Sequence, residues 1–331
     1  MKAIRAVRNF ALLAVMAGGF TVYRLGSPYQ GFEKETFVDV PRGTSTGAIA
    51  GLLADAGVVR SRWDFLAARV AARGRKLQAG EYRFDHAATP MEVYARVARG
   101  DIFYIQLVAT EGQNMFDIAA SAEKLGLFPA AEFLAAARNP RPIRDLDPKA
   151  PTLEGYLFPN TYRVGRHTTP EQLCGMMTAR FREVWRGLRT DADVHEVVTL
   201  ASMVEKEAKL EDERPLIAAV YANRLRIGMK LDCDPTTIYA ALMEGAYRGA
   251  IYQSDLARDN PYNTYKRAGL PPGPIANPGL ASLTAAIAPA ASKDLYFVAR
   301  PDGSGAHQFS ADLAAHEKAA TEYRRGKRRK K

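Results

Sequence analysis

Short alternating stretches and longer stretches of helical periodicity follow one another along the chain, which predicts an α+β fold. Residues 37–40 and 81–84 alternate apolar and polar side chains, as strands do. Around them, apolar residues recur every three or four positions behind Ser, Thr or Pro. That spacing predicts one helix that ends at Gly57, one over 61–72 and one over 89–100.

From Leu153 onward the helical patterns become longer, which predicts a second and larger mixed unit. Helices are expected over 170–188 and 194–209, from Asp212 and Pro215 to Gly228, and from Asp234 onward, followed by a strand in LYFVARP and one last helix. The segment 260–279 is rich in Pro, Gly, Asn and Tyr and is too long for a simple connector. Long loops of that kind usually carry function.

A weak internal repeat links two distant parts of the chain. FVDVPRGTSTGAIAGLLADAG (37–57) and IQLVATEGQNMFDIAASAEKLG (105–126) share a strand, a turn with glycine, a helix with Ile-Ala and a closing glycine. This strand–turn–helix order is typical of small LysM-like units, which bind glycans, although many α+β domains share it.

The N-terminus predicts export. Lys2, Arg5 and Arg8 precede an uncharged stretch from 9 to 23 that closes at Arg24. The stretch is shorter than the roughly 20 residues that span a bilayer, but flanking arginines can snorkel. A signal peptide cleaved after Val15-Met16-Ala17 fits equally well. By the positive-inside rule the basic start stays in the cytoplasm, so we expect the rest outside it.

Charge does not point to nucleic acid. The 331 residues carry a formal charge of +10, but RRGKRRKK (324–331) holds seven of those charges, and no basic stripe with interleaved aromatics appears elsewhere. The tail is expected to be disordered, with an anionic membrane surface or wall polymer as the functional alternative. The two cysteines and five histidines lack metal-ligand spacing, so we expect no metal and no cofactor.

Glu205 stands out because it interrupts an apolar helix face. At roughly 100° per residue, one face of the helix over 194–209 holds Val194, Val197, Val198, Ala201, Val204 and Ala208. Glu205 projects into this face, whereas Glu207 points to its edge. A buried carboxylate is costly unless it is paired or protonated, and burial favours the protonated form that a general acid needs. The alternative is a structural glutamate paired with an arginine, for which Arg224 is the obvious candidate.

Five motifs carry a resemblance to a known family. LEGYLFPNTY from Leu153, ASMVEKEA from Ala201, YANRLRIGMKLDCDPTTIY from Tyr221, NPYNTY from Asn260 and GLPPGPIANPG from Gly269 resemble the endolytic murein transglycosylase (MltG, YceG-like) family, in the right order. The likeness runs from the apolar N-terminus to about Tyr323. Met203 and Ala208 vary within their motif, and the basic tail is not carried over.

The resemblance implies a domain plan. It comprises a cytoplasmic N-terminus (1–8), a transmembrane anchor in the inner membrane (9–25), a linker (26–36), a LysM-like α/β subdomain (37–110) and a larger α+β catalytic domain (111–323), with the basic tail (324–331) left over. The catalytic domain would lie in the periplasm. Its partners would be peptidoglycan glycan strands, with peptidoglycan synthases or the division and elongation machinery as candidate protein partners.

The resemblance also implies an activity. A lyase of this family cleaves the bond between N-acetylmuramic acid (MurNAc) and N-acetylglucosamine (GlcNAc), and leaves 1,6-anhydroMurNAc ends that terminate nascent strands. The first Glu of EKE, Glu205, would be catalytic. Candidate substrate-binding residues in the matching motifs are Glu154, Arg224, Asp234, Asn263, Thr264, Tyr265 and Pro271.

These assignments leave alternatives open. Asp234 before Pro235 is a good helix N-cap, and Asn263 to Tyr265 also suit an ordinary turn. At the level of the whole protein, a non-enzymatic wall-binding scaffold would rest on the LysM-like repeat alone. A hydrolase would use Glu205 with Asp234 as its second carboxyl.

Overall fold

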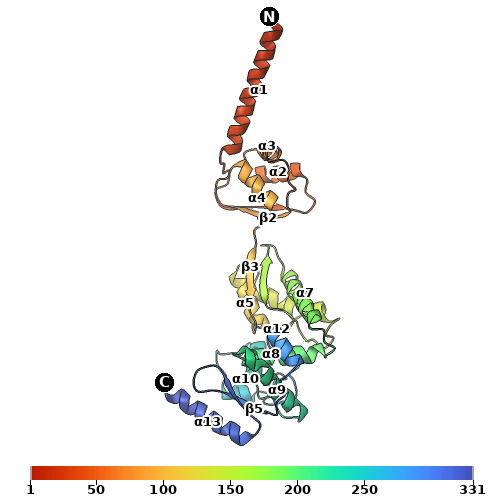
Figure 1. The fold of residues 1–331 in the computed structure, drawn as a ribbon, viewed down its shortest axis with the longest axis vertical. Coiled ribbons are helices and arrows are strands. Elements are labelled where there is room, and N and C mark those ends of the chain that lie inside the picture. The colour runs from red at the N-terminus through yellow and green to blue at the C-terminus, as the bar shows by residue number, and fades with distance from the viewer. Residues whose placement is uncertain (1, 330–331) are drawn as a thin grey trace. The chain divides into compact units, whose positions relative to one another are not determined.

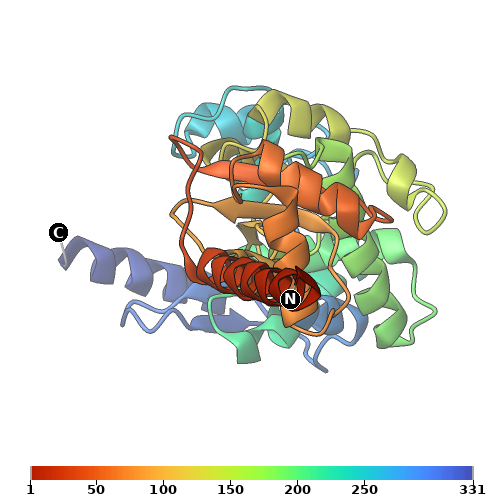
Figure 2. The same cartoon turned by 90° about the horizontal axis from the view of Figure 1, so that it is seen from above.

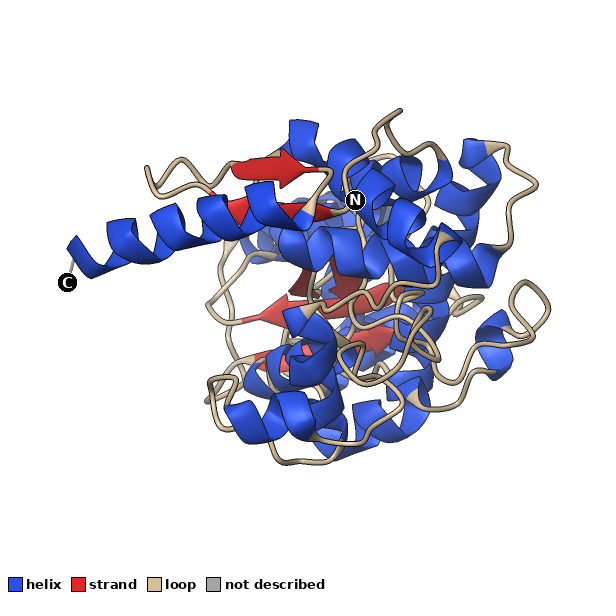
Figure 3. Ribbon diagram, turned by 90° about the horizontal axis from the view of Figure 1, so that it is seen from below, coloured by secondary structure: helices blue, strands red, loops and turns tan. Residues whose placement is uncertain are grey.

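The structure is a computed structural model that describes residues 2–329. The chain divides into two compact units, with the boundary between residues 105 and 106 (Figure 1). Helices make up far more of each unit than strands do, and the strands are short (Figure 3). The mixed α+β class expected from the periodicity is therefore confirmed.

The first unit contains one antiparallel strand pair and four helices. β1 and β2 pair with Val38 opposite Tyr82. In chain order the elements are α1 (Lys2–Gly26), β1 (Thr36–Val40), α2 (Thr46–Asp55), α3 (Arg62–Ala71), β2 (Gly80–Phe84) and α4 (Pro90–Arg99). The expected strands and helices of this region are all present. Thr89 and Glu92 form a capping box at the start of α4, and Gly100 ends it in the left-handed region.

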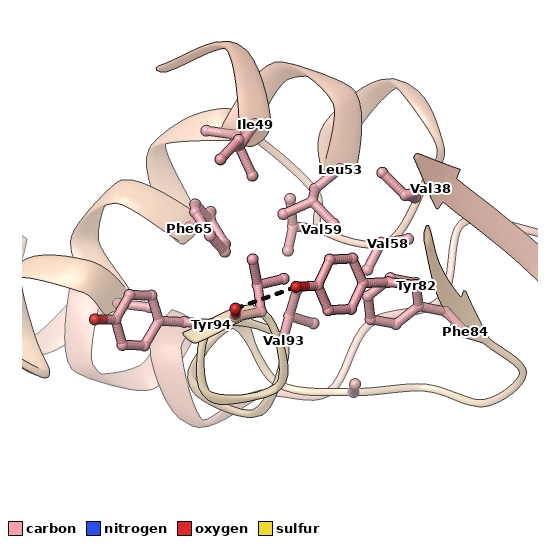
Figure 4. Packing of buried hydrophobic residues seen from close by; sticks show 14 of the residues in the cluster. Val38, Ile49, Leu53, Val58, Val59, Phe65, Tyr82, Phe84, Val93 and Tyr94 are labelled. Atoms are coloured by element: carbon pink, nitrogen blue, oxygen red, sulfur yellow. Dashed lines mark hydrogen bonds between the residues drawn. The ribbon is translucent and has the colours of Figure 1, made fainter. Parts of the chain in front are cut away.

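The core of this unit lies between the strand pair and the helices (Figure 4). Alternate strand residues point inward, so Val38, Val40, Tyr82 and Phe84 are buried. The Tyr82 hydroxyl donates to the carbonyl oxygens of Gln78 (2.8 Å) and Val97 (3.3 Å), which removes the cost of burying it.

α1 is a helix over the whole apolar stretch and exposes its large side chains. Phe10 is 76% exposed, Val15 74% and Met16 67%. Near its end, Arg24 pairs with Asp64 of α3 at 2.5 Å. Within residues 2–329, none of the helices combines the length and apolar character needed to cross a bilayer.

The second unit holds two strand pairs, β3 with β4 and β5 with β6. Its strands are β3 (Ile105–Ala109), β4 (Asn160–Val164), β5 (Tyr296–Ala299) and β6 (His307–Ser310). Its α-helices are α5 (Met115–Lys124), α6 (Ala130–Ala137), α7 (Pro170–Leu188), α8 (Val194–Glu207), α9 (Arg214–Arg226), α10 (Asp234–Met243), α11 (Gln253–Ala257), α12 (Leu280–Ile287) and α13 (Leu313–Arg329). Short 3-10 turns lie at Arg141–Ile143 and Glu211–Glu213.

Two boundaries differ from expectation. β3 pairs with β4 of the second unit, so this strand does not belong to the 37–110 subdomain. The tail that we expected to be disordered is helical as far as Arg329, since α13 continues through it, and residues 330 and 331 lie outside the described residues. The last turns of α13 project from the second unit (Figure 1; Figure 2).

α8 lies at the centre of the second unit, against α9, α10 and α12. Every residue from Val197 to Val204 is buried, so the helix is enclosed on all sides. The periodicity predicted one apolar face on this helix, but the structure buries residues on every face of it. Enclosure reaches the last turn, where the two glutamates lie.

Candidate active site

Glu205 lies in the last turn of α8, and both of its carboxylate oxygens are hydrogen-bonded. Arg214 Nη2 donates to Oε1 at 3.1 Å, and the Gly279 backbone N–H donates to Oε2 at 3.0 Å. The Glu205 side chain is 6% exposed and that of Arg214 is 13% exposed. Each carboxylate oxygen has a second acceptor position, so the two donors do not use up the hydrogen-bonding capacity of Glu205.

The arginine partner is not the one expected. Arg214 begins α9, and its Nε donates to Ser282 Oγ of α12 at 3.0 Å, which fixes the guanidinium. Arg224 lies elsewhere. It donates to the carbonyl oxygens of Leu295 (2.6 Å) and Leu231 (2.9 Å) and lies over the Tyr296 ring. Arg224 also pairs with Asp232 at 3.6 Å, so its contacts are with backbone carbonyls, an aromatic ring and a carboxylate other than Glu205.

The turn between β3 and α5 closes one side of the site. Lys206 Nζ donates to the Gly112 carbonyl at 3.0 Å. A methyl group on Gly112 would lie 3.6 Å from Glu205 Cγ, so the turn is in direct contact with the glutamate. Gly112 has φ +77°, where glycine is favoured.

Asn277 ties this turn to the rest of the site. Its amide Nδ2 donates to the carbonyl of Gln113 (2.9 Å) and to Glu154 Oε1 (2.8 Å). Its Oδ1 accepts from the backbone N–H groups of Gly155 (2.8 Å) and Leu157 (3.0 Å). Two backbone bonds add to these, from Gly112 N to Asn277 O and from Asn277 N to Gln113 O. Asn277, two residues before Gly279, therefore joins the turn at Gly112 and Gln113 to residues 154–157.

Glu154 is a buried anchor of this network and has no access to a ligand. It is 1% exposed, and its Oε2 accepts from Met115 N at 2.9 Å, at the start of α5. Burial raises the pKa of Glu154 to about 8. The next residue, Gly155, has φ +88°, and a methyl group there would lie 2.5 Å from Pro274 and 2.8 Å from Val198. The LEGY loop thus packs closely on α8 and on the loop before α12.

A cleft of about 560 Å³ opens beside Arg214, within the ~300–1,000 Å³ range of ligand sites. Glu111, Glu211 and Arg214 line its polar side, and Leu280, Thr284 and Ala285 of α12 line the other. Glu111 lies over Gly279, since a methyl group there would come within 1.9 Å of Glu111 Oε1. Burial, and then the charge of Glu205, raise the pKa of Glu111.

Three candidate residues, Arg224, Asp234 and Tyr265, line a second pocket of about 390 Å³ together with Glu207. The Tyr265 hydroxyl donates to Asp234 Oδ1 at 2.6 Å. Asp234 is the first residue of α10 and makes no capping hydrogen bond, so the N-cap interpretation is wrong. Glu207 accepts from Cys233 Sγ at 3.5 Å, and burial raises its pKa to about 7.

Asn263, Thr264 and Pro271 are buried rather than exposed on a cleft wall. Asn263 Nδ2 donates to the carbonyl oxygens of Asp255, Leu256 and Arg258. Thr264 Oγ1 accepts from Cys233 N at 3.0 Å. Their contacts hold the loop in place before it reaches Asn277, which differs from the cleft-wall role that we expected.

Arg214, Glu111 and Asn277 were missed from the sequence. Asn277 and Gly279 lie inside the GLPPGPIANPG motif, so the motif itself could have drawn attention to them. Glu111 lies in the turn of the second repeat, which was read only as a structural unit. Arg214 carries no such signal, because an arginine at the start of a helix is ordinary on the protein surface.

A carboxyl held beside a cleft by a guanidinium and a backbone amide is typical of an acid–base enzyme. The YceG-like family model matches residues 38–322, and the chain belongs to this family.

Known proteins similar to this chain agree with that membership. An endolytic murein transglycosylase of Bacillus subtilis (strain 168) is 32% identical over 333 residues, covering 93% of this chain and 91% of the relative. An endolytic murein transglycosylase of Streptococcus pneumoniae is 30% identical over 300 residues. That match covers 81% of this chain and 54% of the relative, so the chain spans about half of that protein. A crystal structure of a yceG-like protein from Listeria monocytogenes aligns with TM-score 0.55 at 31% identity, covering 87% of this chain and 99% of the other.

Proposed function

We propose that this protein is an endolytic peptidoglycan lytic transglycosylase, a lyase that cuts glycan strands between MurNAc and GlcNAc and leaves 1,6-anhydroMurNAc ends. Family membership and the two relatives support the class of enzyme. The observation that carries the proposal for the site is Glu205, a mostly buried carboxyl with two fixed donors, one of which, Arg214, lines the cleft.

In the proposed reaction Glu205 acts twice. Its protonated form gives the proton to the glycosidic oxygen, and the bond from that oxygen to C1 of MurNAc breaks. The resulting carboxylate then takes the proton from the C6 hydroxyl of MurNAc, and O6 bonds to C1 to close the anhydro ring. Atoms and protons balance without water, so the substrate supplies the nucleophile that other glycosidases take from water or a second carboxyl.

Arg214 and the Gly279 N–H can stabilise the anionic form of Glu205 between the two steps of the reaction. After the first step Glu205 is an anion, and both groups already point at its oxygens. Donors fixed in advance stabilise developing charge without rearranging at the moment of reaction. Their positions depend on Ser282 and on the Asn277 network.

The decisive experiment is mass spectrometry of the products from purified glycan strands. The proposal requires ends that are lighter than reducing ends by one water molecule. Reducing ends would instead identify a hydrolase, and intact strands would favour a non-enzymatic scaffold. The hydrolase with Asp234 as its second carboxyl has little geometric support, because Asp234 faces the second pocket and bonds to Tyr265.

For the N-terminus we propose membrane anchoring, with the rest of the chain outside the cytoplasm. Large apolar side chains exposed along α1 and the flanking Arg8 and Arg24 support it. The full chain should fractionate with membranes and keep its first residues. A mature N-terminus just past Ala17 would show a cleaved signal instead.

The first unit and the tail are proposed to hold the enzyme at its substrate. The β1–α2–α3–β2 order supports a LysM-like, glycan-binding role. Deleting the residues after Tyr323 should leave cleavage of soluble strands unchanged and weaken salt-sensitive binding to anionic vesicles. Termination of nascent strands, beside synthases or the division and elongation machinery, is the cellular role that we propose.

A further inference from the structure

Two carboxyl groups lie against the same glycine. Gly279 N–H donates to Glu205 Oε2, and the Glu111 carboxyl occupies the space that a side chain on Gly279 would need. Glu111 comes from the β3–α5 turn, and Glu205 from the end of α8. Hydrogen bonds with Lys206 and Asn277 hold the turn in place, and the turn fixes the position of Glu111.

The two donors to Glu205 suit the base step of the proposed reaction better than the acid step. A guanidinium and a backbone N–H both stabilise the charged carboxylate. A general acid must nevertheless carry its proton when the substrate arrives. Something nearby must therefore offset the positive charge of Arg214.

We propose that Glu111 is a positioning residue that keeps one proton in the cluster Glu111–Glu205–Arg214, so that Glu205 can act as the acid despite its arginine partner. With both carboxyls ionised the cluster carries one net negative charge, and like charges at one site favour the uptake of a proton. Burial, followed by the charge of Glu205, raises the pKa of Glu111, so Glu111 is a group that can hold the proton of the cluster. This inference rests on the proposed function, because it concerns the acid step of that reaction.

Few other charges face these two carboxyls. α8 contributes Lys206, which donates to the Gly112 carbonyl, and the turn before α9 contributes Glu211 at the cleft. α9 contributes Arg214 itself. α12 carries no titratable side chain in its sequence LASLTAAI. The proton balance of the site is therefore set mainly by Glu111 and Arg214.

The test is the pH profile of kcat/KM for Glu111→Gln on soluble strands. Without the negative charge of Glu111, the positive charge of Arg214 is no longer offset. We therefore expect Glu205 to lose its proton at lower pH in this variant. The alkaline limb of the profile should move down by about one to two pH units, so kcat/KM above it should fall by about 10- to 100-fold. Glu111→Asp, which keeps the charge, should retain most of the parent profile. Glu132→Gln removes the same charge from an exposed position on α6 and serves as the matched control.

Gly279→Ala tests the same point by a different route. Its φ of −79° suits alanine, and the contacts of the added methyl group are with the Glu111 side chain. It should therefore displace Glu111, keep the N–H bond to Glu205, and reproduce the shifted limb. In a Glu111→Ala background the same change should have no further effect.

The outcomes separate the two proposals. A parent enzyme that makes no anhydro ends refutes the proposed function itself. A parent that makes them, with Glu111→Gln and Gly279→Ala both folded and their pH profiles superimposed on the parent's, refutes only the role of Glu111. Thermal unfolding of each variant shows whether it is folded.

Discussion

The two strand–turn–helix repeats, residues 37–57 and 105–126, share their local structure but differ in the contacts that their turns make. Ser45 and Asn114 accept hydrogen bonds as N-caps of α2 and α5. Gly57 and Gly126 close the helices at φ +69° and +70°. The turns differ sharply. A methyl group on Gly43 of the first turn would meet nothing within 4 Å, whereas one on Gly112 of the second would contact Glu205.

The difference shows how one local motif can serve two purposes. Caps and closing glycines decide that a strand, a turn and a helix form, and they do so from neighbouring residues alone. What the turn does depends on residues far away in the chain, here Lys206 and Asn277. The first turn stays at the surface, and the second becomes a wall of the candidate active site.

The largest expected effect on cleavage comes from replacing Glu205, the carboxyl next to the second turn. Glu205→Gln loses both the transferable proton and the later base, and since acid–base catalysis contributes about 10²–10⁴-fold, cleavage should fall by about 10⁴-fold or more. The amide can accept from only one of Arg214 and Gly279, so stability should fall by about 1–2 kcal/mol. Strand cleavage and thermal unfolding measure both effects. A Glu205→Gln protein that still forms anhydro ends would refute the assignment.

Glu154→Gln should have the next largest effect, because it loosens the network that holds the second turn. Glu154 accepts from both Met115 N and Asn277 Nδ2, and a glutamine offers only one acceptor oxygen. We expect a loss of about 1–3 kcal/mol in denaturant unfolding. Cleavage should also fall, because Asn277 lies close to Gly279 in the chain. Lost stability with unchanged cleavage would mean that Asn277 holds its place without Glu154.

Gly112→Ala and Gly43→Ala test the comparison directly. Both glycines have positive φ, +77° and +85°, so alanine should cost each about 1–2 kcal/mol. Only Gly112→Ala should also lower cleavage of strands, because its backbone is bonded to Asn277 and Lys206. Equal losses of activity in the two variants would show that the second turn has no special role.

The smallest effect on activity is expected at Glu207, which lines the second pocket and not the cleft beside Arg214. Burial raises the pKa of Glu207 to about 7, so the stability due to its protonated form is full below about pH 4.5 and is lost as pH rises through 7. Glu207→Gln should therefore gain about 3 kcal/mol over the parent at pH 8 relative to pH 4.5, with cleavage nearly unchanged. Denaturant unfolding at the two pH values checks this. Identical pH dependence in both proteins would contradict it.

The sequence reveals local features of this molecule better than long-range ones. The helices with Ser or Thr caps and closing glycines, such as α4, were predicted within a residue or two. α6 and α12 were missed, because AAEFLAAA and LASLTAAI are apolar on most sides and show no polar face. β4 was hidden in an aromatic stretch, and its pairing with β3 required knowledge of a contact between distant segments.

The same limit applies to the site. Glu205 was found because a carboxyl among valines is locally unusual. Its partner was misassigned to Arg224, since helical spacing cannot tell which of the three arginines on the next helix contacts Glu205. The motif residues Asn263 and Thr264 were expected at the cleft. They are buried because they satisfy backbone carbonyl and N–H groups of the loop.

The bonds of Asn277 have a consequence for how the protein is made. Its partner Gln113 lies 164 residues earlier in the chain, and Gly155 lies 122 residues earlier. Contacts of such long sequence separation form late, because a large loop must close before they contribute. A growing chain is synthesised from its N-terminus onward, so α5 and the LEGY loop are made well before Asn277, the residue that joins them. We therefore expect catalytic competence to arise only after synthesis has passed residue 279, long after most of the helices can form.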